Sequence, residues 1–369
     1  MVVPESTQYV LVTGGLGYIG SHTVIKLIEN GYKVLVVDNL ENSKIESLHR
    51  IKRVLKTSKF EIDENDLLFY QEDLRNFAKI DDYLNKFYQK NNFIETIIHF
   101  AGLKSVNESV LNPLKYYDCN IISSLNLLKI LDKFKIKNLI FSSSATVYGD
   151  VTSLNDDSLL PLKEDLYLKT PVNPYGNTKL IIETMLKDYA VSNKDCKIAT
   201  LRYFNPIGAH PSGLIGEDPL GEPMNLLPIL SKFTMEGKRL KVFGNDYNTQ
   251  DGTCIRDYIH VQDLSRGHVL TLEKLNDFDN NYNEWNLGSG EGVSVLQIVK
   301  AWGKTTGIAS NFEIVNKRSG DVEILLADVT KSKNELNFEC EYGIAESCEH
   351  LWNWTLNYFK ELELNLDYS

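Results

Sequence analysis

A tyrosine and a lysine four residues apart form the pair in this sequence that best suits proton transfer. Asn173 and Pro174 suit the N-cap and the first position of a helix. In that helix Tyr175 and Lys179 share one face, which continues through the apolar Ile182 and is expected to point inward. An ammonium stabilises a phenolate, which a tyrosine with an ordinary pKa of ~10 needs before it can act as a base near neutral pH. The alternative is an aromatic ring packed on a lysine stem.

Closely spaced glycines follow an apolar run near the N-terminus and precede an amphipathic segment. Gly15, Gly17 and Gly20 satisfy G-x-G-x-x-G, whereas Gly14, Gly17 and Gly20 satisfy G-x-x-G-x-x-G, and the sequence does not choose between the two patterns. Glycine suits such a turn because a pyrophosphate must approach main-chain N–H groups without meeting a Cβ. A helix N-terminus then supplies free donors and partial positive charge. The pattern predicts a dinucleotide site, and its alternative is a plain structural turn.

Asp38 ends the next apolar run, at residues 33–37, roughly 20 residues after the glycines. A carboxylate at this place accepts hydrogen bonds from both hydroxyls of an adenine ribose but repels a 2′-phosphate. The residue therefore predicts NAD rather than NADP. Its alternative is a solvated charge at the end of a strand.

Apolar runs alternate with helical patterns through the first two hundred residues, which predicts an α/β protein with a doubly wound (Rossmann-type) parallel sheet. The expected strands are residues 9–13, 33–37, 67–71, 96–100, 138–142 and 197–203. Ligands of such sheets bind beyond the carboxyl ends of the strands. Small or polar residues follow each of these expected strands, and Ser144 follows the fifth strand.

The composition of the sequence changes after residue 204, where a stretch rich in proline and glycine runs from residue 205 to residue 223. Loops of that length inside compact enzymes are usually functional. We therefore expect an NAD-binding domain at residues 1–204 and a smaller C-terminal α/β substrate lobe at residues 205–369. The segment near 256–275 is a candidate to return to the first domain.

The composition disfavours several classes of partner. The 369 residues carry a net charge of −11, so nucleic acid and anionic membranes are not expected, and a phosphorylated ligand must be held by local arginines and backbone. The five cysteines have no C-x-x-C spacing and are expected to be reduced and mostly buried, and the seven histidines show no metal-binding spacing. With no leader and no long apolar run, the sequence predicts a soluble, cytoplasmic protein without a metal.

The glycine pattern, Ser144 and the Tyr175-x-x-x-Lys179 pair together resemble the extended short-chain dehydrogenase/reductase superfamily. Longer motifs narrow the resemblance to its family of UDP-glucose 4-epimerases, also called UDP-galactose 4-epimerases. They are TGGLGYIGSH at 13–22, HFAGLK at 99–104, FSSSATVYG at 141–149, LRYFNP at 201–206 and RDYIHV at 256–261. The similarity runs from about residue 10 to about residue 354, which is almost the whole chain.

The resemblance implies an isomerase of galactose metabolism that interconverts UDP-galactose and UDP-glucose by transient oxidation at carbon 4 of the hexose, with NAD bound throughout. In such an enzyme Tyr175 takes the proton from the 4-hydroxyl, and Ser144 hydrogen-bonds to the same oxygen. Lys179 holds the nicotinamide ribose and lowers the pKa of the tyrosine. The family is usually a homodimer built on helices, which implies the segments near 113–134 and 174–190 here.

The resemblance also implies two sets of binding residues. The cofactor positions are Gly14, Gly17, Tyr18, Ile19, Gly20, Asp38, Asn39, Leu40, Asn42, Ser43, Asp73, Leu74, Phe100, Ala101, Gly102, Lys104, Asn120, Tyr175, Lys179 and Phe204. The UDP-sugar positions are Ser144, Asn205, Asn225, Leu226, Lys241, Val242, Phe243, Arg256, Arg318 and Asp321. Two arginines suit a diphosphate because a guanidinium offers paired donors in a fixed fork.

Two rival functions share the fold. Nucleotide-sugar 4,6-dehydratases carry Thr-Asp-Glu after the fifth strand, whereas this chain reads Ser144-Ala145-Thr146 and lacks both carboxylates. A non-catalytic NAD-dependent sensor would be free to lose Tyr175 or Lys179. Another sugar-nucleotide epimerase also remains open, because Leu325 stands where some family members have Tyr and others Cys beside carbon 2 of the hexose. A leucine there is expected to disfavour N-acetyl sugars.

Overall fold

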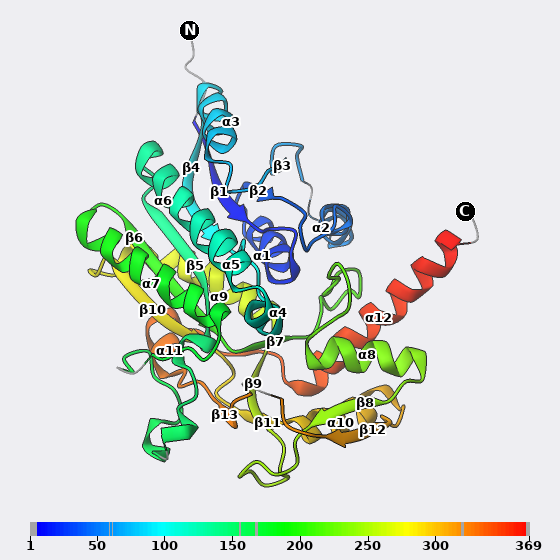
Figure 1. Ribbon diagram of the computed structural model, residues 1–369. Coiled ribbons are helices and arrows are strands. Elements are labelled where there is room, and N and C mark those ends of the chain that lie inside the picture. Colours follow the sequence, from blue (N-terminus) through cyan, green and yellow to red (C-terminus); the bar gives the residue numbers. More distant parts are fainter. Residues whose placement is uncertain are drawn as a thin grey trace.

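Seven parallel strands form the central sheet of the computed structural model, which describes residues 6–366 except 59, 61, 155, 167, 168, 319 and 320 (Figure 1). Their order across the sheet is β10-β6-β5-β4-β1-β2-β3. The bounds are β1 (Thr7–Thr13), β2 (Val34–Asp38), β3 (Leu67–Gln71), β4 (Asn92–His99), β5 (Asn138–Ser144), β6 (Lys197–Tyr203) and β10 (Tyr282–Leu287). All six predicted strands are confirmed, whereas β10 was not predicted. Its sequence, YNEWNL, mixes polar and apolar residues because it lies at the edge of the sheet beside β6.

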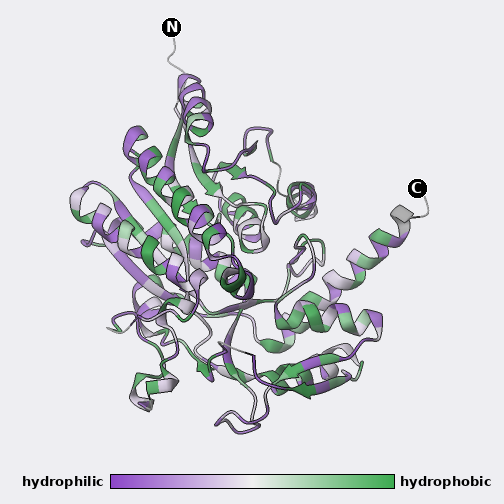
Figure 2. Cartoon of the chain, viewed as in Figure 1, coloured by the Kyte–Doolittle hydropathy of each residue, from purple (hydrophilic) through white to green (hydrophobic). Residues whose placement is uncertain are grey.

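Helices cover both faces of this sheet, which confirms the doubly wound class. One core contains Val10 and Val12 of β1 together with residues of α1 (Tyr18–Glu29), α2 (Glu46–Thr57) and α9 (Val261–Lys274). The other contains Tyr9 and Leu11 of β1 together with residues of α3 (Phe77–Gln89), α6 (Ser123–Phe134) and α7 (Pro174–Ser192). Successive residues of β1 thus feed opposite cores. The covering helices accordingly carry both hydrophobic and hydrophilic residues (Figure 2).

Short segments lead from the strand ends toward these helices. After β4 come α4 (Val106–Leu111), α5 (Pro113–Tyr116) and a π-helix (Tyr117–Ile122) that runs directly into α6. After β5 comes a 3-10 turn (Ala145–Tyr148), followed by two further single turns (Thr152–Leu154 and Asp157–Leu159). Both stretches lie at the carboxyl edge of the sheet, where ligands of this fold bind.

A smaller lobe lies beyond that edge (Figure 1). One small sheet joins β7 (Asn205–Ile207), β9 (Ile255–His260), β11 (Gly292–Ser294) and β13 (Ile324–Leu325), and β8 (Leu240–Phe243) pairs with β12 (Phe312–Val315). The lobe's helices are α8 (Leu226–Glu236), α10 (Val295–Thr306) and α12 (Ile344–Leu366). They share a core that includes Leu227, Trp302 and Trp354.

The chain crosses between the two parts more than once. After β9 in the small sheet, α9 packs against α1, the turn Leu275–Asp277 follows, and β10 pairs with β6. The short α11 (Thr330–Leu336) contacts both β10 and α9. The division at residue 204 remains a prediction. Within the described residues, no helix combines the length and the apolar character needed to cross a membrane.

Candidate active site

The glycine turn between β1 and α1 contains glycines that the protein itself requires. Gly14 has a φ of +68°, and a Cβ on it would lie 2.6 Å from the backbone nitrogen of Ala101. A Cβ on Gly20 would lie 2.3 Å from the carbonyl oxygen of Gly14. Gly15 also needs to be small, because a Cβ on it would lie 2.9 Å from Val36 Cγ1. Both glycine patterns of the sequence therefore have a packing reason.

Gly17 differs from these three because little of the protein opposes a side chain there. Its φ is −71°, and a Cβ on it would have Gly14 O at 3.3 Å as its nearest neighbour. Gly17 is the N-cap of α1, and no side chain caps that end of the helix. The turn thus offers uncapped N–H groups and a residue without a Cβ, which is the cradle that a pyrophosphate needs.

Asp38 is held in place by three donors from its own chain. Its Oδ2 accepts from the backbone N–H of Leu16 at 3.0 Å, and its Oδ1 accepts from the N–H of Leu40 at 2.9 Å and from the Ser43 hydroxyl at 2.8 Å. Only 7% of the residue is exposed, so it is not a solvated charge. Each carboxylate oxygen can accept more than one hydrogen bond, so Asp38 can still accept a hydrogen bond from ribose hydroxyls.

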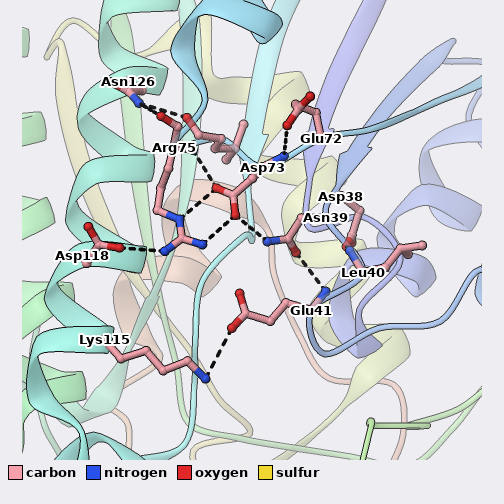
Figure 3. A network of polar contacts seen from close by, with 11 residues as sticks. Asp38, Asn39, Leu40, Glu41, Glu72, Asp73, Arg75, Lys115, Asp118 and Asn126 are labelled. Carbon is pink, nitrogen blue, oxygen red and sulfur yellow. Dashed lines mark hydrogen bonds and ion pairs between the residues drawn. The ribbon is translucent and has the colours of Figure 1, made fainter.

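A polar network ties the ends of β2 and β3 to the π-helix (Figure 3). The Asn39 amide donates to Asp73 Oδ2 at 2.9 Å. The Arg75 guanidinium donates to both oxygens of Asp73, at 3.0 and 2.8 Å, and to Asp118 at 2.7 Å. Arg75 thereby lowers the pKa of Asp73 to about 2. The network holds Asn39 and Asp73, two of the expected cofactor residues, in one place.

Ser144 and Tyr175 meet at the carboxyl end of β5. Asn173 caps α7 as predicted, because its side chain accepts from the Gly176 N–H at 2.8 Å. Tyr175 packs near Leu103 on the edge of a small buried cluster. Burial raises the pKa of Tyr175 above 10, and a hydrogen bond with Ser144 acts in the opposite direction. A positive charge beside the phenol would lower the pKa further.

Lys179 lies one turn further along α7, on the inward face as predicted. It is 5% exposed, and its Nζ donates to the carbonyl oxygen of Ser142 at 2.7 Å. The Nζ atom lies 5.8 Å from the centroid of the Tyr175 ring. Burial lowers the pKa of Lys179 to about 8, although Glu183 opposes this shift. The Ser144 hydroxyl, the Tyr175 phenol and the buried Lys179 amine therefore lie close together, an arrangement suited to transferring one proton at a substrate oxygen.

Buried side chains hold this group in position; Asn120 among them is an expected cofactor residue, whereas Thr178 and His99 are not among the expected site residues. The Asn120 amide donates to the Thr178 hydroxyl at 3.0 Å and to the Leu103 carbonyl at 3.1 Å, and its oxygen accepts from the Leu103 N–H at 2.8 Å. His99 bonds to Thr13 at 2.7 Å and to Ser124 at 2.9 Å. The position of Thr178 next to Lys179 in the sequence did not indicate this positioning role, because its partner Asn120 lies far away in the sequence.

The expected sugar-nucleotide residues of the smaller lobe lie on several strands. Asn205 begins β7, and its Oδ1 is buried without a hydrogen-bond partner among the described residues. The Arg318 guanidinium stacks 3.8 Å from the centroid of the Phe243 ring. Arg256 pairs with Leu325 in the register of β9 and β13, and its guanidinium donates to the Glu323 carbonyl at 3.2 Å. An orphan oxygen and a stacked guanidinium suit a polar, anionic ligand.

The remaining expected residues fall into three groups. Leu74 and Val242 are buried in hydrophobic cores, so a ligand can reach only their main chain. Residues that are partly or fully exposed are Tyr18, Ile19, Asn42, Phe100, Ala101, Gly102, Lys104, Leu226, Lys241 and Asp321. Phe204 is buried in a cluster with Ala145, against which Leu325 packs. Leu325 therefore lies close to the turn that follows Ser144.

The sequence matches the model of a family described as "Epimerase: NAD dependent epimerase/dehydratase family" over residues 10–288. It is 45% identical to the UDP-glucose 4-epimerase of Bacillus subtilis over 359 residues, covering 96% of this chain and 99% of that protein. The bifunctional protein gal10 of Schizosaccharomyces pombe is 46% identical over 95% of this chain, but only 47% of that protein is covered. The chain thus spans about half the length of that relative and of a second bifunctional protein from Pachysolen tannophilus.

Among solved structures, a UDP-glucose 4-epimerase from Bifidobacterium longum in complex with NAD⁺ and UDP superposes with a TM-score of 0.86 at 41% identity. The superposition covers 95% of this chain and 98% of that one. The chain therefore belongs to the NAD dependent epimerase/dehydratase family.

Proposed function

We propose that this chain is an NAD-dependent epimerase that interconverts UDP-galactose and UDP-glucose. One observation carries the proposal: Ser144, Tyr175 and Lys179 converge at the carboxyl end of β5, in the fold that also carries the glycine turn and Asp38. Relatives that match along their whole length, such as the enzyme of Bacillus subtilis, are named for this activity.

The residues around the glycine turn fit NAD. Gly17 leaves the N-terminus of α1 open to a pyrophosphate, and Asp38 has acceptor capacity for ribose hydroxyls. The acidic Asp38 would repel the extra phosphate of NADP. When bound, NAD would accept a hydride from carbon 4 of the hexose and return it, so the reaction needs no external oxidant.

The chain's own residues would handle the proton and the orientation of the sugar. Tyr175 removes the proton from the 4-hydroxyl and later returns it, while the Ser144 hydroxyl fixes the same oxygen. The Lys179 ammonium would hold a ribose and stabilise the phenolate of Tyr175. Arg256, Arg318 and the orphan Oδ1 of Asn205 would bind the nucleotide part and keep the reacting end in place.

Incubating the purified protein with UDP-galactose and following the sugar by NMR tests the proposal. We expect UDP-glucose to appear until both sugars reach equilibrium, with no NADH released into solution. Stoichiometric NADH in solution would instead indicate a dehydrogenase. Loss of water to a 4-keto-6-deoxy sugar would indicate a dehydratase, which the absence of carboxylates at Ala145 and Thr146 argues against.

We also propose a homodimer that pairs the helices near 113–134 and 174–190. Large apolar side chains are exposed there: Leu111 of α4 is 79% exposed, Leu114 of α5 is 81% exposed, and Leu125 of α6 and Ile181 of α7 are 39% and 38% exposed. Burying such a patch favours association. Sedimentation of the wild type and of Leu114→Glu tests this, because the variant should shift toward monomer while Met235→Glu on α8 should not. The cytoplasmic location expected from the sequence is part of the same proposal.

A further inference from the structure

Glu217 is a shielded carboxylate that contacts one residue from each expected ligand site. The Lys104 Nζ donates to its Oε1 at 2.7 Å. The Asn225 amide donates to its Oε1 at 3.1 Å and to its Oε2 at 3.4 Å. The Glu217 side chain is only 8% exposed, whereas that of Lys104 is 51% exposed. Lys104 is an expected cofactor residue after β4, and Asn225 is an expected sugar-nucleotide residue before α8.

The loop that carries Glu217 is fixed by packing. Ile215 is 1% exposed and belongs to the core under the large sheet. Next to it, a Cβ on Gly216 would lie 2.5 Å from Trp354 Cδ1 of α12. Asp218, the residue after Glu217, accepts from Lys44 Nζ at 2.5 Å. Glu217 therefore cannot move far, and the side chains that bond to it take their positions from it.

Both donors keep spare capacity for a ligand. An ammonium has three N–H donors, and Lys104 uses one of them on Glu217. Asn225 occupies the N-cap of α8, yet its side chain makes no capping bond to that helix and turns to Glu217 instead. The Lys104 Nζ also lies 6.0 Å from the ring centroid of Tyr18 in the first turn of α1. Glu217 thus stands between the helix that would receive the pyrophosphate and the helix that would receive the sugar nucleotide.

We propose that Glu217 is a positioning residue shared by the two ligand sites and that it couples the binding of NAD to the binding of the UDP-sugar. A phosphate that accepts from a second N–H of the Lys104 ammonium also fixes the Glu217 carboxylate to which this ammonium bonds. The fixed carboxylate holds the Asn225 amide in one orientation, so less side-chain freedom is lost when the sugar nucleotide binds. By linkage the effect is reciprocal, so each ligand tightens the other. The inference rests on the proposed function.

The rate at which NAD leaves the protein, measured with and without saturating UDP, tests the coupling without turnover. In the wild type UDP should slow the release of NAD. Glu217→Gln keeps a similar shape but loses the charge, so NAD release should become about three- to tenfold faster, as expected for one charge-assisted hydrogen bond at a half-exposed lysine. UDP should no longer slow NAD release in this variant, and the affinity for UDP should fall.

Asp218→Asn is the matched control, because it removes the neighbouring carboxylate that bonds to Lys44 and not to Asn225. In the Asp218→Asn variant UDP should slow the release of NAD as it does in the wild type. Asn225→Ala, at an exposed position, should lose the slowing of NAD release at saturating UDP, and it serves if Glu217→Gln does not fold.

A Glu217→Gln or Asn225→Ala variant in which UDP slows release as in the wild type would overturn the inference. So would a wild type that binds both ligands with no mutual effect. A wild type that binds neither NAD nor UDP would instead contradict the proposed function.

Discussion

Tyr175 lies in surroundings that oppose its ionisation. Burial raises the pKa of its phenol, and the hydrogen bond with Ser144 offsets only part of that shift. The amine of Lys179, with a pKa of about 8, lies near the ring and donates to the carbonyl oxygen of Ser142. A neutral phenol in the resting site protects against unproductive proton loss, and phenolate is favoured when positive charge arrives beside it.

Replacing Tyr175 with Phe should leave the protein folded but cut epimerase turnover by at least ~10²-fold, because the ring still packs while no proton can be exchanged. Turnover of UDP-galactose and the NAD content of the purified protein are the measurements. Tyr189→Phe, on the same helix, is the control and should keep wild-type turnover. A Tyr175→Phe variant with normal turnover would show that another residue moves the proton.

Leu325 should restrict the width of the hexose pocket. It packs against the cluster that contains Ala145 and Phe204, near the turn after Ser144. Overpacking costs typically ~1–3 kcal/mol, which would suppress an N-acetyl sugar by roughly ten- to a hundredfold. Leu325→Ala should therefore raise kcat/KM for UDP-N-acetylglucosamine while changing that for UDP-galactose less. Equal kcat/KM values for both sugars in the wild type, or an unchanged ratio of the two kcat/KM values in the variant, would show that Leu325 does not restrict the pocket.

At the scale of elements, a buried arginine joins α7 to the sheet beneath it. Arg202 of β6 is fully buried and donates to both oxygens of Glu183 on α7, at 3.0 and 2.9 Å. The Ser143 hydroxyl of β5 donates to the same carboxylate at 2.6 Å. Glu183 follows Lys179 by one turn, so this clamp sets how α7 presents the face that carries Tyr175 and Lys179 to β5.

Arg202→Met should destabilise the protein by about 3 kcal/mol, because it leaves the Glu183 carboxylate buried without its cation. Urea unfolding at neutral pH measures the loss. Arg239→Met is the control: its guanidinium is 3.6 Å from Glu313 and half exposed, so the change should be at most about 1 kcal/mol. Equal effects of the two substitutions would mean that the clamp contributes no more than a surface ion pair.

Two glycines of the turn should differ in their importance: Gly14 for folding and Gly17 for binding NAD. Gly17→Ala meets little resistance in the protein, since only Gly14 O lies within reach of the added Cβ, so thermal stability should change little while NAD affinity falls at least about tenfold. Gly14→Ala places a Cβ against the backbone of Ala101 at a positive φ and should lower the melting temperature. Gly17→Ala that retains NAD as the wild type does would show that no phosphate approaches this residue.

At the scale of the whole molecule, histidines gather between the two parts of the chain. His260 Nε2 lies 3.0 Å from His350 Nδ1 of α12, and the ring of His22 on α1 lies 6.4 Å from that of His210. Burial lowers the pKa values of His22, His210 and His260 to about 3, 4 and 2, and also lowers that of His350. The rings of His22, His210 and His260 therefore stay neutral in the folded protein above about pH 4.

The free energy of unfolding should fall as the pH drops below about 6.5. Between about pH 4 and 6.5 the unfolded chain binds protons on these histidines and the folded chain does not, so stability is present above this window and is lost through it, at up to ~1.4 kcal/mol per pH unit for each histidine. Denaturant unfolding at pH 7.5, 6.5 and 5.5 measures the slope. His260→Gln should reduce the slope, whereas the exposed His49→Gln should not. A flat profile would contradict the buried neutral state.

The sequence by itself determined the layered class and the placement of Tyr175 and Lys179 on one face of a helix, because both depend on short-range pattern. Continuous apolar runs can be buried only as strands covered on both faces, and a spacing of four places Tyr175 and Lys179 on one side of a helix. Capping by Asn173 is equally local, since its partner is three residues away. The strand β10 escaped prediction because an edge strand needs no continuous apolar run.

Only the tertiary structure decided which distant residues act together. Arg202 meets Glu183 and Glu217 meets Lys104 and Asn225 through contacts between separate elements, and no spacing in the chain encodes them. The roles of Gly14 and Gly15, in which the two patterns left open by the sequence differ, were likewise a matter of packing, because a Cβ on either would meet another part of the protein. Such choices depend on how separate elements pack against each other, because charge pairing and steric contact act through space rather than along the chain.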